Sequence, residues 1–446
     1  MLSGFRARLV EHGLEEKVLD LLLARCAELG LVKAGGRQRT DSTHVVAAVR
    51  GLSRLELVGE TMRSALEALA VAAPGWLAAH VEPEWLQRYG ARVEGYRLPK
   101  SDDKRGGLRL QTGHDGYRLL AVVLAGAAPA WLAEIPAVQT LRLVWVQQYS
   151  RTCSPEGGQE VRWREDDDLP PGRLRVTSPY DTDARYGMKH GEGWDGYKVH
   201  LAETCDDVDA SGRPHLATGV ATTQATVPGV AMAGPVHADL ARKGLLPSGH
   251  VVDAGYTTAD LLVTSRSDYG VTLTGPLPAD TSRQAAAKTG FQPAAFTIDF
   301  AAQQVICPAG ATSTTWAPTR DPRSGKDVIR ARSSPATCRP CPLREQCTHD
   351  KTGARQLMSH PSQQHQALQA ARAEQATDAW WQRYAVRSGV EAPCTRPSPP
   401  RGSAAPATAA RPRPDSPTCP PPPRSTSSGS TPGGPALLPP GPGPAT

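Results

Sequence analysis

Strand-like and helix-like patterns alternate between residues 197 and 274, and this order limits the folds open to the chain. Tyr197–Ala202 and Leu216–Thr222 alternate apolar and polar side chains with the period of a strand. A third strand-like run, rich in β-branched residues, extends from Arg39 to Val46. Further along, we expect short buried strands at 251–253 and 271–274, and helices at 230–243 and 258–269. The pattern predicts an α/β fold with a mixed sheet and helices packed on it.

Helical patterns dominate the chain before this region. Apolar residues recur at helical spacing from about residue 8 to 31, which predicts one amphipathic helix. Residues 52–149 are mostly helical and rich in alanine and leucine, so we expect a large helical insert, about 52–150, between the first two strands. Helical spacing returns at 362–390.

Composition changes abruptly at residue 392. Of the 55 residues from Ala392 to Thr446, 18 are proline, and none is Val, Ile, Phe, Tyr, Trp, Lys or Glu. Such a segment cannot bury enough apolar surface to offset the entropy cost of ordering, so we expect a disordered Pro-rich tail over 393–446. The preceding chain divides into a helical start at 1–38, the α/β core with its insert at 39–280, a cysteine-rich insert at 281–350 and a helical end at 351–392.

The bulk properties exclude a membrane-spanning chain. No apolar run is long enough to cross a bilayer, and the first residues lack the pattern of a signal peptide. Nine cysteines in 446 residues are few for a disulfide-built secreted protein, which favours a reduced, cytoplasmic location. The net charge of +6 permits binding to nucleic acid without requiring it.

Two aspartates occupy positions typical of a catalytic carboxylate. Asp253 ends the apolar run Val251-Val252 and precedes Ala254-Gly255-Tyr256, which is where chemistry gathers in open α/β sheets. An Asp beside a Gly is also a common turn, and the sequence favours neither interpretation. Asp41 lies inside a run of strand formers, where an edge-strand Asp is the alternative. A shared site requires the two on neighbouring strands.

A third carboxylate follows near the end of the last helical segment. Tyr384, Arg387 and Glu391 are spaced so that one helix face presents all three. Glu391 is then a candidate metal ligand, and Tyr384 and Arg387 are candidate phosphate contacts. A surface Glu–Arg pair is the alternative, and it is commoner for any single instance. Three carboxylates can hold two divalent cations for phosphoryl transfer.

Four cysteines predict a second metal site, at Cys307, Cys338, Cys341 and Cys347. Four thiolates can close a tetrahedral zinc site, and nearby arginines make this region suited to contact with DNA. Unligated thiols or a redox pair are the alternatives. Lys189 and Lys198 belong to a basic segment with interleaved aromatic residues, which suits contact with the DNA backbone, and a solvated hairpin explains the segment nearly as well.

Together these motifs resemble the DDE-type transposases of bacterial insertion sequences, which use a ribonuclease-H-like catalytic domain. The resemblance covers about residues 2–392. It rests on Arg39-Thr40-Asp41-Ser42-Thr43-His44-Val45, Trp194-Asp195-Gly196-Tyr197-Lys198-Val199-His200-Leu201, Val252-Asp253-Ala254-Gly255-Tyr256 and Tyr384-Ala385-Val386-Arg387-Ser388-Gly389-Val390-Glu391.

The resemblance implies a ribonuclease-H-like mixed sheet and a catalytic triad of Asp41, Asp253 and Glu391 that binds two Mg²⁺ ions. It implies hydrolysis of DNA at transposon ends, followed by attack of the freed 3′-hydroxyl on target DNA. Tyr384 and Arg387 then position DNA phosphates. Relatives carry a similar cysteine insert, here a candidate Zn²⁺ site, and pairing of two DNA ends favours a homodimer.

The chain departs from the family pattern at both ends. It lacks most of the family's N-terminal helical DNA-binding region, and after Glu391 it gives Ala392-Pro393 in place of a continuing basic helix. We therefore expect a transposase truncated at its N-terminus and frameshifted after Glu391, with doubtful catalytic competence. Two alternatives stay open: a non-catalytic DNA-binding remnant, and a metal-dependent nuclease without strand transfer.

Overall fold

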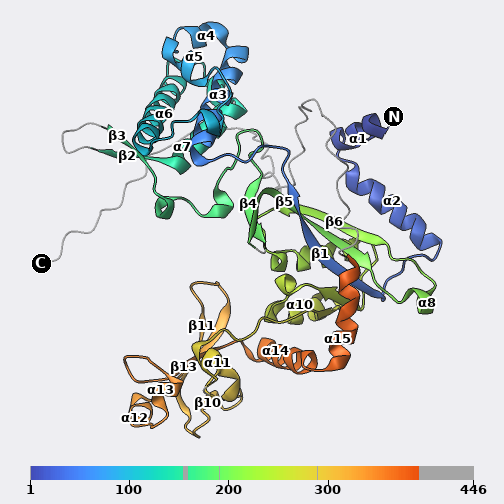
Figure 1. The fold of residues 1–446 in the computed structure, drawn as a ribbon. Helices are drawn as coiled ribbons and strands as arrows, with labels where there is room; N and C mark the ends of the chain where they lie inside the picture. Colours follow the sequence, from blue (N-terminus) through green and yellow to red (C-terminus); the bar gives the residue numbers. More distant parts are fainter. Residues whose placement is uncertain (1, 154–158, 190, 289, 391–446) are drawn as a thin grey trace, which may run out of the picture. The chain divides into compact units, whose positions relative to one another are not determined.

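A mixed sheet forms the centre of the main unit of the chain, which begins at Leu19. The computed structural model describes residues 2–153, 159–189, 191–288 and 290–390 (Figure 1). The strands of the sheet are β1 (Arg37–Val46), β4 (Arg185–Lys189), β5 (Glu192–Thr204), β6 (Ala217–Gln224), β7 (Gly249–Val252) and β8 (Thr272–Thr274). The predicted α/β class with a mixed sheet is confirmed.

Strand directions in this sheet follow one simple plan. The order is β6-β5-β1-β7-β8, and β4 pairs with the first part of β5. Strand β5 is antiparallel to β1, β4 and β6, whereas β7 is parallel to β1 and β8 is parallel to β7. Because β1 and β7 are parallel neighbours, the residues that follow their ladder on the two strands lie beside one another, although β1 itself continues to Val46.

Helices cover this sheet through small apolar clusters. The predicted helices are present as α9 (Ala233–Arg242) and α10 (Ala259–Tyr269), and a further short helix, α8 (Val208–Ser211), follows β5. Val236 and Leu240 of α9 pack with Leu23 and with Ala202 of β5. Thr258 caps the start of α10, and Gly270, with a left-handed backbone, ends it.

The single helix predicted from about residue 8 to 31 is wrong. The structure has two helices, α1 (Leu2–Glu11) and α2 (Glu15–Glu28). Gly13 separates them with a positive φ of 60°, a conformation that glycine adopts without strain and that interrupts a helix. Residues before Leu19 belong to a different unit from the rest of the described chain, so α1 is described by itself.

The stretch from residue 54 to 148 is helical, as its pattern predicts. Its helices are α3 (Arg54–Ala72), α4 (Pro74–Ala78), α5 (Pro83–Tyr89), α6 (Asp102–Val123) and α7 (Pro136–Gln148). Ser53 begins α3 with a capping box, and Trp85 and Trp145 are fully buried in the core that these helices share. A hairpin that the sequence did not predict follows, formed by β2 (Tyr149–Cys153) and β3 (Gln159–Trp163).

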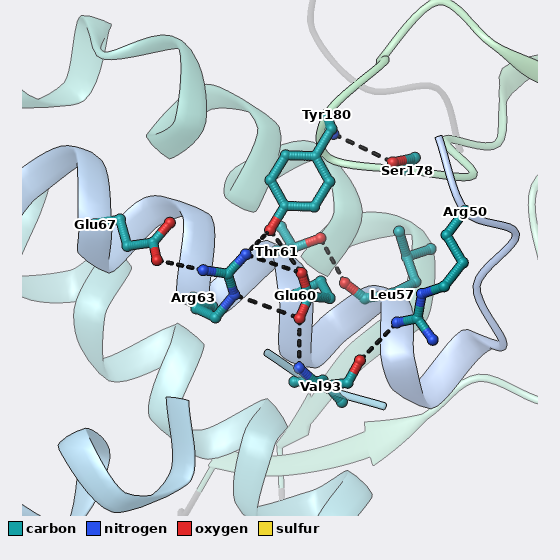
Figure 2. Close-up of polar contacts among 9 residues, drawn as sticks. All are labelled: Arg50, Leu57, Glu60, Thr61, Arg63, Glu67, Val93, Ser178 and Tyr180. Atoms are coloured by element: carbon teal, nitrogen blue, oxygen red, sulfur yellow. Dashed lines mark hydrogen bonds and ion pairs between the residues drawn. The ribbon is translucent and has the colours of Figure 1, made fainter. Parts of the chain in front are cut away.

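A buried carboxylate ties this helical region to the loop before β4. Figure 2 shows Glu60 of α3 accepting hydrogen bonds from the Tyr180 hydroxyl at 2.6 Å and from the Val93 amide at 2.5 Å. Arg63 pairs with Glu60 at 3.1 Å. The next loop residue, Asp181, accepts a hydrogen bond of 2.6 Å from Tyr197 of β5. The loop therefore links α3 to the sheet by two adjacent side chains.

A smaller β-rich region contains the four cysteines of interest. Its elements are α11 (Arg283–Ala287), β9 (Thr297–Asp299), β10 (Gln304–Ile306), β11 (Ser313–Arg320), β12 (Asp327–Ser333), α12 (Pro335–Cys338), α13 (Arg344–Cys347) and β13 (Gln356–Ser359). Strands β11, β12 and β13 form an antiparallel sheet, and β9 pairs with β10. Phe291, Phe296 and Leu357 fill a small core of their own.

The continuous helix predicted for 362–390 is also wrong. The structure divides it into α14 (Ser362–Gln375), α15 (Asp378–Tyr384) and a 3₁₀ segment, η8 (Ala385–Val390). Thr377 causes the first break, because its side chain caps α15 by accepting the Trp380 amide. Among the described residues no helix is long and apolar enough to cross a membrane.

Candidate active site beside two parallel strands

Asp41, within β1, and Asp253, directly after β7, lie where the ladder between these two strands ends. The ladder between β1 and β7 ends with the pair Thr40 and Val252, and the two aspartates are the next residue on each chain. The condition that the sequence left open, neighbouring strands, is therefore met. Burial is the main cause that raises the pKa of Asp41, and the charge of Asp253 adds to it.

The Asp41 carboxylate is buried, with 6% of the residue exposed. One of its oxygens accepts the Ser42 amide at 2.7 Å, and the other accepts a charged hydrogen bond of 2.6 Å from Arg387. Burial raises the pKa of Asp41 above its ordinary value, against the lowering effects of Arg387 and of the Ser42 amide. Asp41 is thus a desolvated carboxylate that needs a positive partner.

Asp253 opens a short turn that a buried aromatic residue holds in place. Its carboxylate accepts the Ala254 amide at 2.7 Å and caps the 3₁₀ turn η6 (Ala254–Tyr256). Tyr256 is 2% exposed, and its hydroxyl is hydrogen-bonded to the buried His200 of β5. Burial lowers the pKa of His200 to about 4, so its ring is neutral near pH 7. The turn after β7 is therefore anchored to β5.

The segment before Glu391 contacts both strands. Segment η8 packs on β1 and β7, and within it Arg387 reaches Asp41. Tyr384 stacks on Trp380 with ring centres 4.9 Å apart, in the last turn of α15. Glu391 lies outside the described residues, so the predicted triad is described at Asp41 and Asp253 alone.

A second arginine, Arg39, joins the same segment to the sheet. Arg39 is 5% exposed and donates two hydrogen bonds to Glu203 of β5, at 2.9 and 2.6 Å. It also donates to the backbone carbonyl of Val386 at 2.5 Å. The side chain thus spans three pieces of the fold.

The two predicted DNA-contact lysines lie close to this edge. Lys189 of β4 is exposed, donates to the Ser42 carbonyl at 3.3 Å and lowers the pKa of Asp41. Lys198 of β5 donates to the Val227 carbonyl at 3.1 Å. Burial, and then the charge of Lys189, lowers the pKa of Lys198. Lys189 therefore adds positive charge near Asp41, whereas Lys198 lies opposite His44 in the ladder of β1 with β5.

The four cysteines are not brought together as Asp41 and Asp253 are. Cys307, Cys338, Cys341 and Cys347 are all half-buried and free of disulfides. Burial raises the pKa of Cys347, and the other three thiols raise it further, so the four are within range of one another's charge. Across the described residues, however, no group of three or more His, Cys, Asp or Glu side chains is close enough to hold a metal ion.

The carboxylates of Asp41 and Asp253 suit a hard divalent cation. Asp41 and Asp253 provide carboxylate oxygens, the ligands that Mg²⁺ prefers. Their mutual repulsion and the burial of Asp41 create a negative site that a cation would relieve. Arg387 supplies positive charge to Asp41 in this structure. In the cysteine region the thiols have the chemistry that zinc requires, whereas their present spacing does not close a site.

Sequence reasoning missed the residues that support these carboxylates. Arg39 and His200 both lie within the motifs on which the resemblance rests, but their residue types alone predict no role there. A long charged side chain two residues before Asp41, on the same face of β1, was the available signal for Arg39. Tyr256 was part of the Asp253 motif, and only the tertiary structure reveals its contact with His200.

Comparison with known proteins gives one family. Residues 306–396 match the model described as the transposase DDE domain. The matched segment includes the four cysteines, α14, α15 and η8, and it ends close to the change in composition at residue 392. No curated protein and no solved structure gave a significant match.

Proposed function

We propose that the chain is a DNA transposase that cleaves insertion-sequence ends and transfers them to target DNA, because its residues 306–396 match the transposase DDE domain. The strand order β6-β5-β1-β7-β8, with β5 antiparallel to its neighbours and β1, β7 and β8 parallel, supports a ribonuclease-H-like core. One observation carries the proposal: Asp41 and Asp253 directly follow Thr40 and Val252, the last residue pair in the ladder of β1 with β7.

In this proposal Asp41, Asp253 and Glu391 are the ligands of Mg²⁺. Bound divalent cations would activate a water, or the 3′-hydroxyl in transfer, and stabilise the leaving oxygen on phosphorus. The protein orients the two described carboxylates through the ladder of β1 with β7 and through the anchored turn at Tyr256. The dry surroundings of Asp41 strengthen its interaction with positive charge.

Basic side chains near the carboxylates would hold the DNA backbone. Arg387 is a planar donor suited to a phosphate, and we propose that it moves from Asp41 to a DNA phosphate when a cation binds. Lys189 and Lys198 would contribute sequence-independent attraction, and Tyr384 would flank the same backbone.

Nicking of a supercoiled plasmid that carries the DNA flanking the gene tests this function. The full chain should nick the plasmid in Mg²⁺ or Mn²⁺, leave a 3′-hydroxyl and lose activity in EDTA. Asp41→Ala should abolish nicking while circular dichroism and binding to the same DNA remain. No nicking by the wild-type chain, or equal nicking by Asp41→Ala, would contradict a catalytic role for this site.

The two alternatives are distinguished by the same assay. A non-catalytic DNA-binding remnant would bind the plasmid and slow its migration in a gel-shift measurement, without nicking it. A nuclease without strand transfer would nick the plasmid but would not join labelled ends to a second duplex. Joined products would support transposition, and sedimentation of the protein with paired ends would test the homodimer that such a reaction favours.

We also propose that the four cysteines hold a structural Zn²⁺. The proposal is supported by the chemistry of four reduced thiols that influence one another's charge. Binding would require the thiols to draw closer than they lie here. Purified protein handled under reducing conditions should contain about one zinc ion per chain. Absence of zinc from such a preparation would contradict this part of the proposal.

A further inference from the structure

We propose that Arg39 is a positioning residue, which holds η8 against β1 and so sets where Arg387 meets Asp41. The inference rests on the proposed function, because it concerns the same site. Arg39 and Asp41 are two residues apart on β1, so their side chains leave the same face of the sheet. Each then contacts η8, Arg39 through the Val386 carbonyl and Asp41 through Arg387.

The Arg39 side chain has a fixed place on the sheet. Glu203 lies directly opposite Arg39 in the ladder of β1 with β5, and its carboxylate accepts two hydrogen bonds from the guanidinium. Both side chains are buried, at 6% and 11% exposed. A buried, doubly bonded ion pair resists displacement, because moving either charge would leave the other unpaired.

The remaining donors of Arg39 point to η8. The guanidinium has five N–H groups in a rigid fork, so it can bind Glu203 and a carbonyl at once. It donates to Val386, and His215 lies 3.3 Å from the same group. Since the acceptor in η8 is a backbone carbonyl, the contact fixes the path of the chain rather than one side chain.

Gly389 is the matching feature on η8. A Cβ at this position would overlap the Arg39 guanidinium, and Gly389 is not among the described glycines with positive φ. Residue 389 must therefore be glycine because a larger residue would leave no space for the Arg39 guanidinium. Arg39 cannot move aside without breaking its bonds to Glu203 and Val386. The close approach presses the segment that directly precedes Glu391 in the sequence against β1.

Hydrogen–deuterium exchange of the full chain tests the proposal directly. Arg39→Lys keeps a positive charge for Glu203 but loses the fork that also reaches Val386. Gly389→Ala disturbs the same contact from η8, without changing the residue at position 39. In both variants, amides of residues 385–390 should exchange about tenfold faster or more, the effect of losing a hydrogen bond to a charged group. Amides of α9 should be unchanged.

Gly126→Ala is the matched control, because a Cβ at residue 126 meets nothing within 4 Å. It should leave exchange at 385–390 as in the wild type. The proposal is overturned if either Arg39→Lys or Gly389→Ala leaves that exchange within about twofold of wild type while both proteins are folded.

A kinetic readout separates positioning from general stability. Arg39→Lys should lower kcat for plasmid nicking by about tenfold or more, because small misplacements of catalytic groups are costly. The plasmid concentration that gives half the maximal rate should change little. If the wild-type chain does not nick DNA, the proposed function fails, but the exchange measurement still decides whether Arg39 holds η8.

Discussion

The sequence predicts metal ligands in two regions, the carboxylates of Asp41 and Asp253 and the four cysteines, but the fold brings only the two carboxylates together. Asp41 and Asp253 are more than 200 positions apart, but the ladder of β1 with β7 makes them neighbours. Cys338, Cys341 and Cys347 lie within ten residues, but they occur on two one-turn helices and the turn between them, without a closed ligand group. A hydrogen-bonded register places side chains more firmly than closeness in the chain.

The largest expected effect concerns the carboxylates. Asp253→Asn should lower plasmid nicking about 10³-fold, since a cation ligand supplies several kcal/mol of transition-state stabilisation. Zinc content should not change, because the cysteine region is independent of this turn. Asp268→Asn, an exposed aspartate in α10, is the control. If Asp253→Asn nicked the plasmid as fast as the control, Asp253 would not be a ligand that the reaction needs.

A cysteine substitution tests the proposed zinc site. Cys341→Ser should reduce bound zinc from about one ion per chain to almost none, because a structural site needs all four ligands. Mn²⁺ binding at the carboxylates should stay within about twofold of wild type, as expected for sites that share no residue. Cys26→Ser, outside the four-cysteine set, is the control. Unchanged zinc in Cys341→Ser, by elemental analysis, would show that these thiols are not the ligands.

The support beneath the carboxylates should be measurable as stability. Glu203→Gln leaves the buried Arg39 charge without its partner, so the free energy of unfolding should fall by about 3 kcal/mol. Glu67→Gln, which removes the more exposed partner of Arg63, should cost less than about 1 kcal/mol. Urea denaturation at one pH compares them. Equal losses would mean that the Arg39 pair adds no more to stability than a surface pair.

A smaller effect is expected in the pH dependence. Burial, with a contribution from Lys198, lowers the pKa of His200 to about 4, whereas an unfolded histidine titrates near 6.5. The unfolded chain therefore binds the extra proton first, and stability is lost as the pH falls from about 6.5 to about 4, by at most about 3 kcal/mol. His200→Gln should flatten this part of the stability curve, and the exposed His114→Gln should not. Equal slopes for wild type and His200→Gln would contradict a neutral, buried ring.

The sequence predicted the sheet well because its strands have strong local patterns. The runs at 197–202, 216–222, 251–253 and 271–274 all became strands, with ends shifted by a few residues. The helices failed where one residue overrode a long periodic pattern. Gly13 divides the first predicted helix, and the cap at Thr377 divides the last. Apolar periodicity cannot register such single-residue stops.

The candidate site was predictable at its carboxylates but not beneath them. Asp41 stands out as a charge inside a β-branched run, and Asp253 as a charge at the end of an apolar one. The contacts of Arg39 with Glu203, and of Tyr256 with His200, join residues 164 and 56 positions apart. These contacts depend on strand order, which local patterns do not encode. The contact between Arg387 and Asp41 is equally non-local.

Titration of the full chain with Mn²⁺ tests most directly whether Asp41 and Asp253 share one cation. Calorimetry should give saturable binding to the wild-type protein. Asp41→Asn and Asp253→Asn should each weaken that binding by about tenfold or more, because each removes a carboxylate ligand of the same ion. Binding that is unchanged by either substitution would contradict a common site where the ladder of β1 with β7 ends.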